Sequence, residues 1–289
     1  MGRSARSRGG LCAFGDRSDV LQNQLRRLPA VGQRSSIRTK GNAMRRTVIA
    51  TGIGALVLSG IAASGVLAAT PSGASQPAAL KASSFPSYPA VTNPYLPMRP
   101  GQTLVYDGIV GAKTKQHDTI KTLSTVKMID GIPAVVQVDT GYLNGALEEI
   151  AYDYFAQDAS GNVWYMGENA TQYQNGKPVS TAGSWLAGVN GARPGIVMEA
   201  APRVGDTYLQ ENWPGQALDA ASVTSLNSSV ATPYGTWIDT ALLTTEFSQL
   251  EPGQSEHKYY VAGIGNVRTV QVTGKPAEYL NLTGIQNTP

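Results

Sequence analysis

The sequence lacks the residues that many common active sites require. Cys12 is its only cysteine, and His117 and His257 are its only histidines. Beyond Cys12 the chain therefore has no disulfide, no thiol nucleophile and no cysteine-based metal site. His117 lies in "TKQHDT", which predicts a hydrophilic turn, and His257 lies at a predicted strand start. Neither histidine lies in an H-E-x-x-H motif, and phosphate-binding loops and G-x-G-x-x-G signatures are missing. The "GIG" at Gly263–Gly265 lies between two predicted strands and predicts a turn. We expect no metal and no cofactor.

The sequence also lacks a serine-hydrolase motif and long helices. Ser184 in "AGSWL" is not followed by the second Gly of a G-x-S-x-G elbow, which argues against acyl transfer. No stretch of about 12 residues or more has a helical stripe of apolar residues.

Positive charge is scarce in most of the chain. Of the 23 Lys and Arg residues, 11 lie in residues 1–68, where Asp16 and Asp19 are the only acids. Residues 69–289 hold the other 18 Asp and Glu residues and are acidic. The formal net charge of +3 therefore comes from residues 1–68. Because the rest of the chain is acidic, this positive charge does not indicate a nucleic-acid partner.

A targeting segment is predicted at residues 44–69. Met44-Arg45-Arg46 precedes the uncharged, apolar stretch Thr47–Ala69, which ends in small residues. This is the pattern of a secretory signal peptide. The alternative is an uncleaved membrane anchor, because the stretch reaches the ~20 residues that span a bilayer. Contact with a membrane is expected only through this segment.

The segments on either side of the signal have low complexity. Residues 1–43 are rich in Arg, Ser and Gly, which is typical of a start codon assigned upstream of Met44 or of a disordered basic tail. Residues 70–95 are rich in Ser, Pro and Ala and predict a flexible linker. Residues 96–289 are long enough for one domain with a substantial core.

The periodicity of this domain is two rather than 3.6. Short runs rich in Val, Thr and Tyr alternate with turn residues roughly every 8–12 positions, at 103–110, 122–130, 133–143, 257–263, 267–274 and 277–285. This spacing predicts a mainly β domain with a single antiparallel curved sheet, either a half-barrel or a barrel. Residues 180–215 are rich in Gly and Pro and predict a loop-rich crossing segment with short strands at 195–200 and 206–211.

A hairpin is predicted around Asp158-Ala159-Ser160-Gly161. Asp at the first position and Gly at the fourth favour a type I turn followed by a Gly bulge. Pairing Asp158 with Asn162 places Tyr154 opposite Met166, Ala156 opposite Trp164 and Tyr152 opposite Glu168. Turn geometry accounts for Asp158, Gly161 and Asn162 without a catalytic role.

One face of this hairpin is aromatic and is the candidate ligand-binding surface. Its predicted members are Ile150, Tyr152, Tyr154, Trp164 and Met166. Such a stripe is most often core, but a concave sheet lined by Tyr, Trp and Met also suits an apolar or carbohydrate ligand. Trp185 and Trp213 of the loop-rich segment complete the set of candidate binding residues.

The remaining chemistry would depend on carboxylates. The candidates are Glu148, Glu149, Asp153, Glu168, Glu199, Glu211 and Glu256. Two acids held at the right separation could hydrolyse glycosidic bonds. Solvated acids at strand edges are the more frequent case, and no catalytic residue is assigned.

Four stretches together resemble a family of exported bacterial proteins of unknown function that are common in high-GC genomes. They are "NPYLPMRPGQTLVYDG" (93–108), "YDYFAQDASGNVWYMGE" (152–168), "GSWLAGVNGARPGIVMEAAPRVGDTYLQE" (183–211) and "EHKYYVAGIGNVR" (256–268). The last stretch is also similar in style to periplasmic, lipoprotein-carrier-like half-barrels. The resemblance implies export and a curved antiparallel sheet, and it supplies no catalytic residues.

The residues favour a non-catalytic binding protein over an enzyme. We expect a protein that is secreted or held at the cell envelope, with a lipid or glycan ligand. Two alternatives stay open, a carboxylate-dependent glycan hydrolase and a structural scaffold without a small ligand.

The leader generates a prediction about processing. We expect cleavage after Ala68 or Ala69, because small residues follow the apolar stretch there. Intact-mass measurement of secreted protein should give an amino terminus at Ala69 or Thr70. A secreted or membrane-held species that retains Met44–Ala68 would contradict the assignment.

Overall fold

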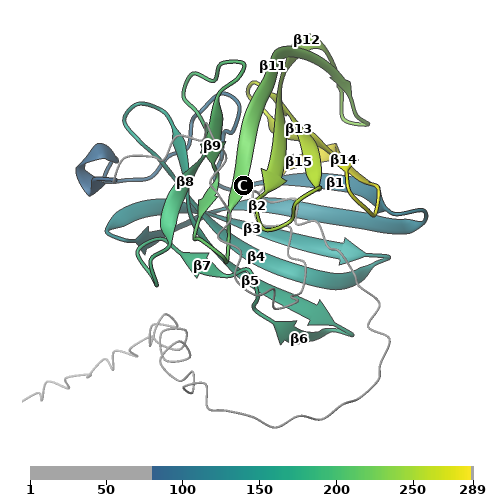
Figure 1. The fold of residues 1–289 in the computed structure, drawn as a ribbon, viewed down its shortest axis with the longest axis horizontal. Coiled ribbons are helices and arrows are strands. Elements are labelled where there is room, and N and C mark those ends of the chain that lie inside the picture. Colours follow the sequence, from purple (N-terminus) through teal and green to yellow (C-terminus); the bar gives the residue numbers. More distant parts are fainter. Residues whose placement is uncertain (1–79, 288–289) are drawn as a thin grey trace, which may run out of the picture. The chain divides into compact units, whose positions relative to one another are not determined.

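The computed structural model describes residues 80–287, so the predictions for the leader and for residues 70–79 lie outside the described residues. The described chain forms 15 strands and one short 3-10 helix (Figure 1). In chain order these are η1 (Ala82–Ser84), β1 (Gln102–Val110), β2 (Thr114–Ile129), β3 (Ile132–Leu143), β4 (Ala146–Gln157), β5 (Val163–Gln174), β6 (Lys177–Ser180), β7 (Trp185–Leu186), β8 (Arg193–Met198), β9 (Thr207–Leu209), β10 (Glu211–Asn212), β11 (Asp219–Ala231), β12 (Thr236–Ser248), β13 (Ser255–Val261), β14 (Gly265–Thr273) and β15 (Glu278–Asn287).

The strands belong to one antiparallel sheet, as predicted. Its order is β10-β8-β5-β4-β3-β2-β1-β15-β14-β13-β12-β11-β9, and β6 and β7 also pair with β5. The two end strands, β9 and β10, are consecutive in the chain and separated only by Gln210. Segment 207–212 therefore pairs with β11 through its first part and with β8 through its second part. The sheet is a nearly closed barrel with one unsealed seam.

The backbone is tightly packed beside this seam. Gly195 on β8 lies directly against the Gln210 carbonyl, and a Cβ at this position would collide with it. Glycine is therefore required where the crossing segment meets the ends of the sheet.

The predicted strand positions match the structure except at the start of β2. His117 was predicted in a hydrophilic turn, and this is wrong, because Thr114–Ile129 is one continuous strand. Its Lys, Gln, His and Asp residues alternate between the two faces of the sheet. Because both faces carry polar residues, the alternation of apolar and polar residues that usually marks a strand is missing here. The segment Gly263–Gly265 is a turn between β13 and β14, as expected.

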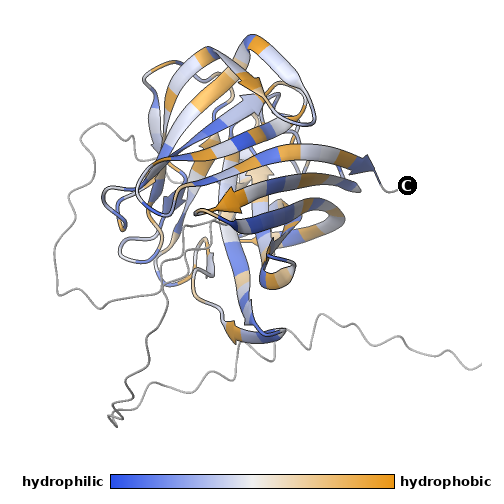
Figure 2. Ribbon diagram, turned by 90° about the vertical axis from the view of Figure 1, so that its right-hand side faces the viewer, coloured by the Kyte–Doolittle hydropathy of each residue, from blue (hydrophilic) through white to orange (hydrophobic). Residues whose placement is uncertain are grey.

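The core follows the alternation of side chains along the strands. Hydrophobic and hydrophilic residues are interspersed along each strand rather than gathered in long bands (Figure 2). The larger of two buried clusters includes Phe155, Trp164, Tyr165, Met166, Trp185 and Met198. The smaller one includes Tyr106, Ala241, Val267, Leu280 and Leu282.

Residues 80–95 pack against this core, although they belong to the stretch that the sequence predicts to be a linker. Phe85, Val91 and Asn93 are buried. The Asn93 Nδ2 atom donates hydrogen bonds to the carbonyl oxygens of Gly161 (3.1 Å) and Glu199 (2.9 Å). In the described part of the chain, no helix is long and apolar enough to cross a membrane.

The predicted turn between β4 and β5 is confirmed. Gly161 has a φ of +97°. The Asp158 carboxylate accepts hydrogen bonds from the backbone N–H groups of Ser160 (2.9 Å) and Asn162 (3.0 Å). Ala156 pairs with Trp164, as the turn requires.

Phe155 also pairs with Tyr165 as predicted, but beyond Phe155 the predicted register is wrong, because β5 contains a bulge. Tyr154 pairs with Gly167 rather than Met166, and Tyr152 pairs with Asn169 rather than Glu168. The extra residue lies between Tyr165 and Gly167, where the register shifts. It moves Glu168 to the face that Tyr165 and Asp153 share.

The bulge requires a glycine at position 167, so substitution there should lower the free energy of unfolding strongly. The φ of Gly167 is +136°, and a Cβ would lie 2.5 Å from the Trp185 carbonyl oxygen. We expect Gly167→Ala to lower the free energy of unfolding by about 3 kcal/mol through strain and collision. Denaturant unfolding measures the loss.

Gly205→Ala is the matched control. Gly205 has a φ of +96°, but nothing lies within 4 Å of its Cβ position. Its loss should be limited to about 1 kcal/mol of backbone strain. Equal losses for the two variants would show that close packing against β7 does not constrain the bulge.

Candidate functional site

A pocket of about 420 Å³ lies where β5, β8 and the turn between β2 and β3 meet. Six of its eleven lining residues have apolar side chains, namely Leu80, Ile132, Trp164, Met166, Ala192 and Pro194. Asp130, Arg193 and Asn212 add polar groups, and Gly188 and Gly191 add backbone. Its volume falls in the range of small-molecule sites, which combine an apolar lining with a few placed polar groups.

The Trp164 ring is fixed in orientation by the β4–β5 turn. Its Nε1 atom donates a hydrogen bond of 2.8 Å to Asp158 Oδ2. The same carboxylate caps the turn through Ser160 and Asn162. The Asp158 carboxylate therefore stabilises the turn and orients the Trp164 ring at the same time. The pocket surface contributed by Trp164 is thus preorganised.

The rim of the pocket is a compact loop between β7 and β8. Ala187 N donates to Met166 O (2.9 Å), and Gly188 N donates to Ala192 O (3.0 Å). The Asp130 side chain packs against Gly188, where a Cβ would lie 2.9 Å from Asp130 Cγ. The loop is thus tied to the floor of the pocket and to the β2–β3 turn.

The structure separates the six predicted binding residues into two groups. Trp164 and Met166 line the pocket together and also belong to the larger buried cluster, with 6% and 0% of their surface exposed. Trp213 follows Asn212 in the chain and donates a hydrogen bond of 3.2 Å to Asn190 O on the rim loop. The other three, Tyr152, Tyr154 and Trp185, are not lining residues.

These three have other surroundings. Tyr152 is 41% exposed and Tyr154 is 7% exposed, and both share the face of β4 on which Ala156 pairs with Trp164. Trp185 is buried and packs edge-on against Tyr165, with ring centroids 5.3 Å apart.

Sequence reasoning missed the polar part of the pocket. Asp130, Arg193 and Asn212 come from three separate parts of the chain, and only folding brings them to one site. Asp130-Gly131 between two apolar runs carried a hairpin signal, because this dipeptide favours a two-residue turn. That signal locates the turn, but it does not show that Arg193 and Asn212 lie beside it in the folded protein.

Several carboxylates predicted to be solvated are buried instead. Asp153, Glu168 and Glu211 are each at most 2% exposed, and Glu149 is 7% exposed. The prediction of strand-edge acids is therefore wrong for these four. Asp153 and Glu168 are paired across β4 and β5, so their side chains share one face. The bulge at Gly167 is what aligns them.

Tyr165 is the common hydrogen-bonding partner of this pair. Its hydroxyl lies 2.6 Å from Asp153 Oδ1 and 3.4 Å from Glu168 Oε2. Burial raises the pKa of Asp153 to about 6. Burial, followed by the charge of Asp153, raises the pKa of Glu168 well above its usual range. Burial therefore disfavours the ionised form of both carboxyls, and the charge of either one disfavours ionisation of the other.

Glu211 lies near this pair and is anchored by Trp185. The Trp185 Nε1 atom donates a hydrogen bond of 3.0 Å to Glu211 Oε1. Burial and the neighbouring Asp219 raise the pKa of Glu211 well above its usual range. None of these acids lines the pocket, so no carboxylate pair is placed across it for glycoside hydrolysis.

Across the sheet, Lys258 is the buried cation that balances a second group of acids. Its Nζ atom lies 2.9 Å from Glu246 Oε2 and 3.0 Å from Glu256 Oε1. These two carboxylates raise the pKa of Lys258 against the effect of burial, so it stays charged. Glu278 is 5% exposed, and neither of its oxygens has a hydrogen-bond partner in the described part of the chain.

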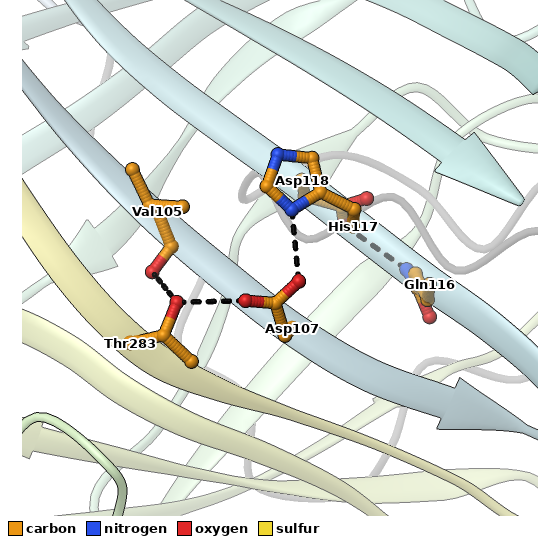
Figure 3. A network of polar contacts seen from close by, with 6 residues as sticks. All are labelled: Val105, Asp107, Gln116, His117, Asp118 and Thr283. Atoms are coloured by element: carbon orange, nitrogen blue, oxygen red, sulfur yellow. Dashed lines mark hydrogen bonds and ion pairs between the residues drawn. The ribbon is translucent and has the colours of Figure 1, made fainter. Parts of the chain in front are cut away.

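His117 belongs to a polar network on the outside of β1, β2 and β15 (Figure 3). Its Nδ1 atom lies 2.8 Å from Asp107 Oδ1, and the Thr283 hydroxyl donates to Asp107 Oδ2 at 2.9 Å. The carboxylate lies between the hydroxyl and the imidazole, so the imidazole does not contact the hydroxyl as it does in a hydroxyl–His–carboxylate triad. Within residues 80–287, no group of three or more His, Cys, Asp or Glu side chains is placed to hold a metal ion.

Comparisons with known proteins identify neither a family nor a function. No protein-family model and no curated protein matches the sequence. One similar solved structure is a predicted exported protein with a YmcC-like fold from Bacteroides fragilis, with 14% identity and a TM-score of 0.32 over 67% of this chain and 99% of that chain. Another is a predicted lipoprotein from Parabacteroides distasonis, with 13% identity and a TM-score of 0.30 over 70% of this chain and 100% of that chain. At these scores neither likeness carries an argument about this protein.

The buried acids predict that stability falls as pH rises. Burial raises the pKa of Glu278 to about 9 and that of Glu149 to about 7. A carboxyl with a raised folded-state pKa contributes stability that is complete below its unfolded pKa of about 4.3 and is lost as pH rises through the folded value. Thermal unfolding should therefore give a lower Tm at about pH 9 than at about pH 5.

Glu278→Gln should flatten this dependence, because the amide cannot ionise. Asp130→Asn is the control, since it changes an exposed carboxylate and should leave the slope unchanged. A wild-type Tm that rises between about pH 5 and about pH 9 would show that these carboxyls have lowered, not raised, folded-state pKa values.

Proposed function

We propose that this protein is an exported, non-catalytic binding protein that takes a glycan-type ligand in the pocket floored by Trp164 and Met166. The observation that carries the proposal is the pocket itself, about 420 Å³ in volume, with an aromatic floor and the polar side chains Asp130, Arg193 and Asn212. Export rests on the signal-peptide pattern of residues 44–69.

The mixed lining favours a glycan over a purely apolar ligand. A sugar ring has an apolar C–H face that packs on an indole ring, and hydroxyls that need hydrogen-bond partners. The exposed part of Trp164, 6% of its surface, would supply the first surface, and Asp130, Arg193 and Asn212 would supply the second. An acyl chain that occupied the same space would leave these polar groups desolvated without partners, which costs binding free energy.

The burial of the acids supports binding rather than hydrolysis. Asp153, Glu168 and Glu211 are almost completely buried and are absent from the pocket lining. A glycosidase needs its two carboxyl groups on either side of the scissile bond, in contact with substrate. In residues 80–287 the acid that lines the pocket is Asp130 alone, without a second carboxylate opposite it.

Ligand titration tests the proposal. Intrinsic tryptophan fluorescence and calorimetry would be followed while oligosaccharides of glucose, mannose and N-acetylglucosamine, and dodecanoate as an apolar probe, are added to the purified protein. At least one oligosaccharide should bind and change the fluorescence. Trp164→Phe should weaken that binding by about 1 kcal/mol, or roughly fivefold, because it shrinks the stacking surface and removes the hydrogen bond to Asp158.

Trp237→Phe is the matched control. Trp237 lies on β12, packs against the smaller buried cluster and is not part of the pocket lining. Its substitution should leave affinity unchanged. Binding of dodecanoate alone would replace the glycan with an apolar ligand, and no binding in any arm would favour a scaffold role.

A further inference from the structure

Two charged groups of opposite sign line the pocket without pairing. Asp130 lies in the turn between β2 and β3, and Arg193 is the first residue of β8. No ion pair of 4.0 Å or less joins them, and neither side chain has a hydrogen-bond or ion-pair partner within residues 80–287. Both are exposed to solvent at the rim.

The buried charged groups Lys258 and Glu211, and the turn carboxylate of Asp158, have partners instead. Lys258 contacts two carboxylates, and Asp158 and Glu211 accept hydrogen bonds from neighbouring side chains. Asp130 and Arg193 are 63 residues apart in the sequence, yet both line one pocket. Asp130 packs against Gly188, and Arg193 pairs with Asn212 across β8 and β10.

We propose that the pocket selects a zwitterionic sugar, in which a carboxylate pairs with Arg193 and an ammonium group pairs with Asp130. The inference rests on the proposed function and specifies its ligand class. The guanidinium presents a planar fork of N–H donors that matches a carboxylate, while a carboxylate such as Asp130 accepts from an ammonium group.

A ligand with only one of the two charges would form one of the two ion pairs. It would gain less than half of the binding free energy that the zwitterion gains. When a ligand covers the pocket, it displaces water from both side chains. A neutral or singly charged sugar therefore leaves at least one charged group partly desolvated and unpaired, which opposes binding. The two charges of the ligand should consequently act together rather than additively.

Four sugars separate the contributions of the two charges. Glucose carries neither charge, glucosamine carries the ammonium group, glucuronic acid carries the carboxylate and muramic acid carries both. Titration at about pH 6 keeps the amine protonated and the carboxylate ionised. An exposed ion pair contributes up to about fivefold in affinity, so muramic acid should bind roughly 25-fold or more tightly than glucose.

Two variants assign each preference to its residue. Arg193→Gln should abolish the preference for the carboxylate and retain the preference for the ammonium group, and Asp130→Asn should do the reverse. Asparagine tolerates the positive φ of +48° at position 130, and both positions are exposed, so both variants should fold. Lys177→Gln on the exposed strand β6 removes the same charge as Arg193→Gln away from the pocket and should change no preference.

The outcomes distinguish this inference from the proposed function. Binding of glucose and muramic acid with equal affinity would overturn the zwitterion preference and leave a glycan pocket. Charge preferences that survive Arg193→Gln and Asp130→Asn would place the selective site elsewhere. The absence of binding by all four sugars and by the oligosaccharides would overturn both.

Discussion

The bulge in β5 determines which side chains meet in this protein. Without it, regular alternation would place Glu168 on the same face as Trp164 and Met166. With one extra residue before Gly167, Glu168 joins Tyr165 and Asp153 instead, while Trp164 and Met166 remain together in the pocket. The bulge depends on a positive φ at Gly167 and on the absence of a Cβ where the backbone of β7 approaches.

This separation gives β5 two chemically different surroundings. Trp164 and Met166 face a pocket with mixed polar and apolar lining, and the ring of Trp164 is held by the turn carboxylate of Asp158. Tyr165 and Glu168 lie among buried acids with raised pKa values. Burial of unneutralised carboxylates is costly, so the domain should be most stable where these groups are protonated. The charged pocket residues Asp130 and Arg193 are exposed to solvent, so they do not carry the free-energy cost of burying a charge.

The sequence was most informative where structure is local. Period-two runs located most strands, and the Asp158–Gly161 turn set the pairing of Ala156 with Trp164. The register failed beyond Phe155, because a bulge depends on the approach of β7, which lies about 20 residues further along the chain. His117 was misplaced because a polar run conceals a strand when both of its faces carry polar residues.

The pocket could be anticipated only in part. Trp164 and Met166 were on the predicted aromatic face, but Tyr152, Tyr154 and Trp185 do not line the pocket. Asp130, Arg193 and Asn212 carry no local pattern that marks a binding site, since their meeting depends on closure of the sheet through segment 207–212. The buried acids escaped prediction for the same reason, because only the closed sheet removes them from water.

The central claim is that a ligand binds against Trp164, and indole resonances in a ¹H–¹⁵N spectrum test it most directly. The chain has four tryptophans, and single Trp→Phe variants assign their Nε1–H signals. On addition of the bound oligosaccharide, the account predicts a shift of the Trp164 signal and a smaller one of Trp213, while Trp185 and Trp237 stay unchanged. A saturable shift confined to Trp237 or Trp185, with Trp164 unmoved, would contradict it.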